Sequence, residues 1–144
     1  MTIEQLDLAP EVEAKARELQ QAAPGVVFLS GRRTLEAQAR AMSQNTVLNR
    51  QYIRETYTSS ALVRALQRWV DTHPEARSEA EIAAGLLRLM KAMPEGVVQG
   101  LSKHLTGRAF DVQPHSCTVE AIEALEPHKF LQREANLVRW HVSW

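Results

Sequence analysis

The chain has 144 residues, of which 44% are apolar and 24% are charged, the ordinary composition of a globular protein. Its 17 basic and 17 acidic residues balance, so no basic excess indicates a nucleic-acid partner or an anionic membrane surface. The length predicts a single domain over residues 1–144.

The N-terminal quarter is predicted to form two helices around one strand. Its first residues lack the basic start and apolar run of a signal peptide, so we expect synthesis in the cytoplasm. Apolar residues recur at helical spacing over 10–23, and Pro10 suits the first turn. Val26–Ser30 is β-branched and aromatic and predicts a strand, and Thr34 is expected to cap a helix through about Met42.

The middle of the chain also predicts helices. Residues 60–72 carry apolar side chains on one face, and Ser78 with Glu81 fits a capping box for a further helix. No apolar run approaches the ~20 residues of a membrane span, so we expect no membrane partner.

The C-terminal third changes character. Short extended segments are predicted at 96–100, 108–114 and 137–144, and the residues after Pro127 are interpreted as a surface turn. The single cysteine, Cys117, excludes an intrachain disulfide and is interpreted as a thiol starting a helix that ends near Leu125. Helices first and strands later predict an α+β fold, with several helices on a small, mainly antiparallel sheet.

Two stretches of this region carry potential metal ligands. His104 and Asp111 are too far apart for one helical turn, so we expect a loop that turns at Gly107 and enters a strand. Strand alternation places Asp111 opposite Phe110, and it places His141 opposite the apolar side of the last segment. If the two strands are neighbours, the three polar side chains converge.

Two imidazoles and one carboxylate form a donor set that suits Zn²⁺ and leaves a fourth position for water. An alternative hypothesis is a helical interaction protein in which His104, Asp111 and His141 are incidental.

The segment "SKHLTGRAFDV" resembles the Ser-x-His-x-x-Gly-x-Ala-x-Asp signature of the zinc D-alanyl-D-alanine peptidases. That family includes DD-carboxypeptidases, dipeptidases and phage L-alanyl-D-glutamate endolysins. The matching residues are Ser102, His104, Gly107, Ala109 and Asp111, and the late Trp140–His141 pair matches the family's third ligand.

A second stretch, "LSGRRTLEAQ", is similar to the family's Ser-Gly-Tyr-Arg-Ser type segment and the glutamine that follows it. Arg33 and Gln38 stand at the arginine and glutamine positions, whereas residues 45–95 match nothing in the family pattern. The resemblance implies that Arg33 stabilises an oxyanion, the alternative being a surface arginine. It also implies that Ser102 and Gln38 either bind the peptide substrate or merely cap or solvate a loop.

The resemblance implies a hedgehog/DD-peptidase-like fold whose zinc ligands are His104, Asp111 and His141. It implies hydrolysis of an amide bond in the peptidoglycan stem peptide by metal-activated water, in a phage, prophage or toxin protein. Such a protein would act on the cell wall or in the periplasm after release or delivery, with a delivery or immunity partner as one candidate interaction.

The sequence departs from the family at the general base. Family members carry an acidic residue three positions before the last histidine, and Val138 stands there. Glu134 is the nearest upstream acid and is the candidate base. Two alternatives remain open: a bulge that changes the register of the last strand, or a module that binds zinc and muropeptides without cutting them.

Overall fold

A computed structural model describes residues 1–133 and 138–144. The chain divides into two compact units: unit 1 comprises Met1–Arg33 and Lys103–Trp144, and unit 2 comprises Thr34–Ser102. The α+β class with a small antiparallel sheet is confirmed, while a single domain over 1–144 stays a prediction.

No helix among the described residues is both long enough and apolar enough to cross a bilayer.

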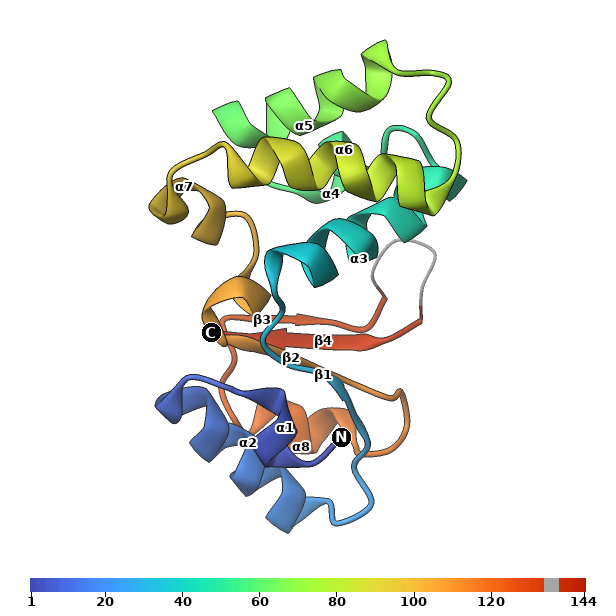
Figure 1. The fold of residues 1–144 in the computed structure, drawn as a ribbon. Helices are drawn as coiled ribbons and strands as arrows, with labels where there is room; N and C mark the ends of the chain where they lie inside the picture. The colour runs from blue at the N-terminus through green and yellow to red at the C-terminus, as the bar shows by residue number, and fades with distance from the viewer. Residues whose placement is uncertain (134–137) are drawn as a thin grey trace. The chain divides into compact units, whose positions relative to one another are not determined.

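The sheet of unit 1 brings the C-terminal strands together. Its described strands are β1 (Phe28–Ser30), β2 (Ala109–Val112), β3 (Lys129–Leu131) and β4 (Trp140–Ser143). They run in the order β1-β2-β4-β3 with antiparallel neighbours throughout (Figure 1). β2 and β4 pair without a register shift, so the two segments that carry the potential ligands are adjacent as expected.

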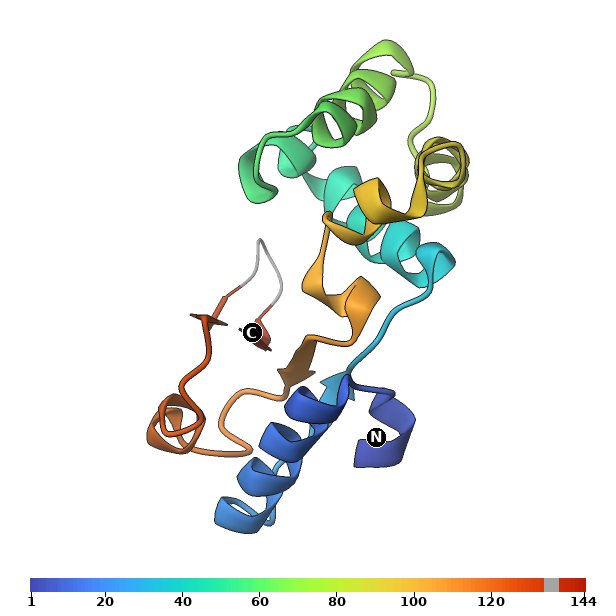
Figure 2. The same cartoon turned by 90° about the vertical axis from the view of Figure 1, so that its left-hand side faces the viewer.

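One face of this sheet forms the hydrophobic core of unit 1. The helices α1 (Ile3–Leu6), α2 (Pro10–Ala22) and α8 (Val119–Glu123) lie on the same side of the sheet (Figures 1 and 2). They bury Phe110 and Val142, and each such side chain contributes about 1.5–3 kcal/mol to folding. Alternation along β2 and β4 therefore directs the intervening side chains to the opposite face.

The loop before β2 turns as the sequence predicts. A short 3₁₀-helix, η1 (Lys103–Thr106), leads into Gly107, whose φ is +72°. A Cβ at this position would lie 2.8 Å from the backbone nitrogen of Ala9, and the Gly107 carbonyl accepts the Ala9 N–H at 3.0 Å. Glycine is required here by both the positive φ and the close backbone contact.

Unit 2 contains α3 (Leu35–Leu48), α4 (Tyr52–Thr56), α5 (Ala61–Thr72), α6 (Glu79–Lys91) and α7 (Glu95–Gln99). Two predicted caps are confirmed. The Thr34 hydroxyl accepts the Ala37 N–H at 3.1 Å, and the Ser78 hydroxyl accepts the Glu81 N–H at 3.1 Å. α3 continues beyond Met42, because its second half buries Ser43 and Thr46 rather than ending in a turn.

Two predictions of local structure were wrong. The segment 96–100 was expected to be extended, but α7 occupies most of it: Val97 and Val98 donate to the Pro94 carbonyl, and only Val98 is buried. Pro94 stands at the N-cap of α7, where its fixed φ and missing N–H do not oppose the start of a helix. The turn expected after Pro127 is instead the strand β3, which forms by pairing with β4, a partner that local sequence does not reveal.

The thiol of Cys117 is buried just before α8, whose N-cap is Thr118. Burial raises the pKa of Cys117, so the thiol stays protonated at neutral pH. The interpretation as a thiol near a helix start is confirmed, although the helix is shorter than predicted.

Candidate metal centre

Three side chains that are distant in sequence converge on the polar face of the unit 1 sheet. His104 comes from η1, Asp111 from β2 and His141 from β4, and Asp111 lies directly opposite His141 in the β2–β4 register. All three are buried, with 2%, 0% and 9% exposure respectively. The convergence that the sequence predicts is therefore confirmed.

The three donor atoms form a compact triangle. His104 Nε2 lies 3.3 Å from Asp111 Oδ1 and 3.2 Å from His141 Nδ1, and His141 Nδ1 lies 3.0 Å from Asp111 Oδ1. A tetrahedral ion with bonds of about 2.0–2.1 Å holds its donors about 3.3–3.4 Å apart. The triangle thus has nearly the size of one tetrahedral face, and the group could hold a metal ion.

Backbone contacts fix the orientation of His104. Its Nδ1 lies 2.8 Å from the Gly31 carbonyl oxygen, which can only accept, so Nδ1 carries the proton. The lone pair of Nε2 then faces Asp111 and His141, as a metal ligand requires. In return, the Arg33 N–H donates to the His104 carbonyl at 3.0 Å.

Gly31 makes this contact possible. A Cβ on Gly31 would lie 2.3 Å from the Leu6 carbonyl oxygen, a backbone atom that cannot turn away. The Leu6 carbonyl also accepts the Arg32 N–H at 2.8 Å, so α1 and the end of β1 hold each other in place. A side chain at this glycine would displace the carbonyl that orients His104.

The second carboxylate oxygen of Asp111 is held by three donors. Oδ2 accepts from the Ser30 hydroxyl at 2.6 Å, from Arg33 Nη2 at 3.1 Å and from Arg139 Nη1 at 3.1 Å. These bonds orient the carboxylate so that Oδ1 faces the two imidazoles. Asp111 would therefore bind a metal through one oxygen.

Asp111 is ionised in this setting. Burial alone would raise the pKa of the carboxyl, but the imidazoles of His104 and His141 beside it outweigh burial and hold the pKa well below its usual range. Arg33 and Arg139 also pair with this carboxylate, so the cluster carries positive charge even without a metal.

The structure places the remaining predicted residues in different surroundings. The Arg33 side chain is 11% exposed and pairs with Asp111, so it is not a solvated surface arginine. Gln38 is buried in α3 of unit 2, where its Nε2 donates to the Tyr57 hydroxyl at 3.1 Å, and Ser102 ends unit 2 half-buried. Glu134 lies outside the described residues.

Val138 stands at the position that carries an acid in the zinc peptidases, and the described structure brings no acid other than Asp111 to the potential ligand group. Val138 is 61% exposed, and β4 pairs with β2 in a continuous register from Trp140 to Ser143. The alternative of a bulge does not hold within this described segment. Within residues 1–133 and 138–144, Asp111 is the one carboxylate in the group that could hold a metal.

Three contributors to the site were not predicted from the sequence. Arg139 directly precedes β4 and could have been found, since alternation along the last segment places it on the same side as His141. Ser30 belongs to the stretch that resembles the family's Ser-Gly-Tyr-Arg-Ser segment, but its position directly opposite Asp111 follows only from the β1–β2 pairing. The Gly31 carbonyl gives no side-chain signal at all.

No family model, curated protein or solved structure matches this chain. The likeness to the zinc D-alanyl-D-alanine peptidases therefore rests on the motif residues. The structure adds the arrangement of those residues, a buried His–Asp–His group of the size that a metal ion needs.

Proposed function

We propose that the protein is a zinc-dependent peptidase that hydrolyses an amide bond in the stem peptide of peptidoglycan. The observation that carries the proposal is the donor triangle of His104, Asp111 and His141, with edges of 3.0–3.3 Å. The same three residues stand at the ligand positions of the zinc D-alanyl-D-alanine peptidase signature. Their number also leaves the fourth position of a tetrahedral ion for water.

When bound, zinc supplies a Lewis acid and lowers the pKa of a coordinated water toward neutrality. The chain's own residues prepare this site. Two imidazoles and one carboxylate would each hold the ion through a single atom, while Ser30, Arg33 and Arg139 donate to the other carboxylate oxygen and fix its orientation. The Arg33 guanidinium, held beside the ligands, is suited to stabilise negative charge on a substrate carbonyl oxygen.

The remaining roles in this proposal come from the resemblance. Glu134 takes a proton from the attacking water, and Ser102 binds the stem peptide. Because Gln38 is fully buried, it does not contact the peptide directly. The protein acts on the cell wall or in the periplasm after release or delivery, and it belongs to a phage, prophage or toxin system. A delivery or immunity protein is its further partner.

A second candidate function is a module that binds zinc and muropeptides without cutting them. It is favoured by Val138, an exposed apolar residue at the position where the family carries its base. Valine can neither accept nor donate a proton, so turnover then depends entirely on an acid from elsewhere.

The test uses purified protein loaded with one equivalent of zinc and a set of defined muropeptides, followed by mass spectrometry of the products. The peptidase proposal expects cleavage that a chelator abolishes and added zinc restores. His104→Ala should abolish both zinc binding and cleavage, whereas His128→Ala, a matched change at an exposed histidine, should alter neither. Muropeptide binding without cleavage at full zinc occupancy would favour the second candidate, and failure to bind zinc would refute both.

A further inference from the structure

A pocket on unit 2 gathers arginines from two helices. It has a volume of about 310 Å³. The side chains that line it are Arg54, Ser59, Val63, Arg64, Gln67, Arg68 and Asp71. This volume lies at the small end of the ~300–1,000 Å³ range of small-molecule sites. Three guanidiniums against one carboxylate leave the pocket with an excess of positive charge.

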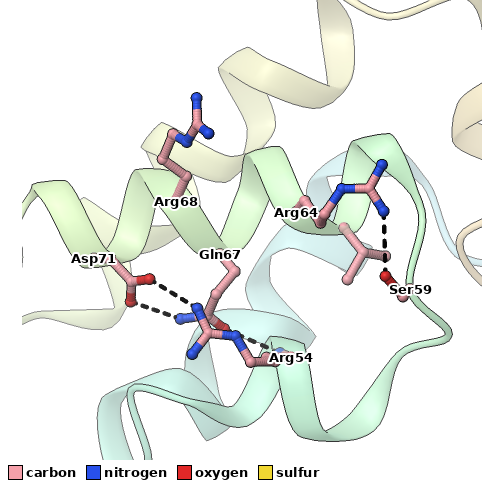
Figure 3. A pocket seen from close by; sticks show the side chains of 7 residues that line it. Arg54, Ser59, Arg64, Gln67, Arg68 and Asp71 are labelled. Atoms are coloured by element: carbon pink, nitrogen blue, oxygen red, sulfur yellow. Dashed lines mark hydrogen bonds and ion pairs between the residues drawn. The ribbon is translucent and has the colours of Figure 1, made fainter.

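The floor of the pocket is a polar network in which the buried Gln67 joins two exposed side chains, Arg54 and Asp71. Gln67, only 2% exposed, donates to Asp71 Oδ1 at 2.9 Å and accepts the Arg54 backbone N–H at 3.0 Å. Asp71 Oδ2 in turn accepts from Arg54 Nη2 at 3.1 Å, and Figure 3 shows these three side chains together at one end of the pocket. Asp71 thus offsets the charge of Arg54, and Arg64 and Arg68 carry the excess positive charge of the pocket.

The other two arginines are not neutralised. Arg64 Nη1 donates to the uncharged Ser59 hydroxyl at 3.3 Å, as Figure 3 shows. The guanidinium of Arg68 makes no hydrogen bond or ion pair with any residue that the structure describes. Arg64 and Arg68 are also four residues apart on α5, where like charges repel and destabilise a helix. Figure 3 shows the Arg64 guanidinium turned toward Ser59 and the Arg68 guanidinium pointing away from it, and an anion bound in the pocket would offset their repulsion.

We infer that this pocket binds a small ligand that carries an oxyanion group, either phosphate or carboxylate, together with an apolar portion that packs on Val63. Guanidinium groups present paired N–H donors whose geometry matches the oxygens of both groups. Val63, which is 5% exposed, is the one apolar side chain among the residues that line the pocket. The inference rests on unit 2 alone and does not depend on the metal centre.

The experiment titrates the full-length protein with phenyl phosphate, with benzoate and with phenol while the Nε–Hε resonances of the arginines are followed by NMR. We expect saturable shifts of the Arg64 and Arg68 signals, with a dissociation constant of about 1 mM or tighter for at least one of the two anions. Whichever anion binds more tightly identifies the ligand class. Phenol, which lacks the charge, should not saturate the site.

Matched variants separate a built site from general electrostatic attraction. Arg64→Gln and Arg68→Gln should each weaken anion binding about fivefold, whereas Arg88→Gln, the same loss of charge at an exposed position of α6 outside the pocket, should leave it unchanged. The inference would be overturned by shifts that stay linear with anion concentration, or by equal weakening in all three variants. Saturable binding of phenol as tight as that of both anions would also overturn it.

Discussion

The metal centre of unit 1 and the arginine pocket of unit 2 use charge in opposite ways. In the metal centre, Asp111 is fully buried, and hydrogen-bonding neighbours at both carboxylate oxygens hold the side chain in one orientation. In the pocket, Arg64 and Arg68 are exposed, and only the floor formed by Gln67 and Asp71 is fixed. The difference shows that a buried charged site needs a hydrogen-bond partner for each of its polar atoms, whereas an exposed site needs few because water solvates its charges.

The largest expected effect is that of removing the negative charge of Asp111 in the metal centre. Asp111→Asn leaves Arg33 and Arg139 without their carboxylate partner and removes a metal ligand. We expect the free energy of unfolding to fall by about 3 kcal/mol or more and stoichiometric zinc binding to be lost. Denaturant unfolding and competition with a chromophoric chelator measure the two effects.

Asp71→Asn in unit 2 is the matched control. Because Arg54 and Asp71 are both substantially exposed, the change should cost less than about 1 kcal/mol and leave zinc affinity unaltered. Equal destabilisation by the two variants would contradict the distinction between the buried and the exposed site.

The next effect is that of replacing Glu134, the candidate general base. If Glu134 accepts the proton of the attacking water, Glu134→Gln should lower the rate of muropeptide cleavage by about 10²–10⁴-fold at unchanged zinc affinity. Glu123→Gln, at an exposed position of α8, is the control and should retain full activity. Unchanged cleavage in Glu134→Gln would remove Glu134 from the mechanism.

A glycine substitution tests whether backbone contacts build the metal centre. Gly31→Ala places a methyl group against the Leu6 carbonyl, so we expect a loss of about 1–3 kcal/mol in stability together with weaker zinc binding. Gly25→Ala meets nothing within 4 Å and should be neutral in both measurements. If Gly31→Ala bound zinc as tightly as wild type, the orientation of His104 would not depend on the Gly31 carbonyl.

The smallest effect expected at the metal centre is that of a single hydroxyl. Ser30→Ala removes the 2.6 Å hydrogen bond to Asp111 Oδ2 while leaving both guanidiniums, and we expect zinc affinity to fall about tenfold. Thr106→Ala deletes a hydroxyl in η1 that bonds the Lys103 carbonyl, and it should leave zinc affinity unchanged. Isothermal titration of zinc into each variant distinguishes the two.

The sequence predicts the metal centre better than it predicts its surroundings. Alternation along two short strands was enough to place Asp111 and His141 on the face opposite Phe110 and Val142. Successive side chains of a strand point to opposite faces, so the neighbours of buried apolar residues must lie on the other face. Arg139 followed the same alternation. Alternation in the sequence predicts the face on which a side chain lies when helices cover one face of the sheet.

Features that depend on distant partners were not predictable. β3 exists because Phe130 and its neighbours pair with β4, and Ser30 reaches Asp111 because β1 pairs with β2. The Gly31 carbonyl acts through the backbone, which every residue shares. The arginine pocket combines α4 and α5, so the arrangement of Arg54 beside Asp71 also required the packed helices.

Zinc K-edge X-ray absorption of the stoichiometrically loaded protein shows which atoms surround the ion. We expect one zinc per chain, bound by two imidazole nitrogens and one carboxylate oxygen at about 2.0–2.1 Å, with a light-atom fourth ligand. The imidazole scattering should fall when either His104 or His141 is replaced by alanine. Zinc that binds with the same spectrum in both variants, or that fails to bind the wild-type protein, would contradict this ligand set.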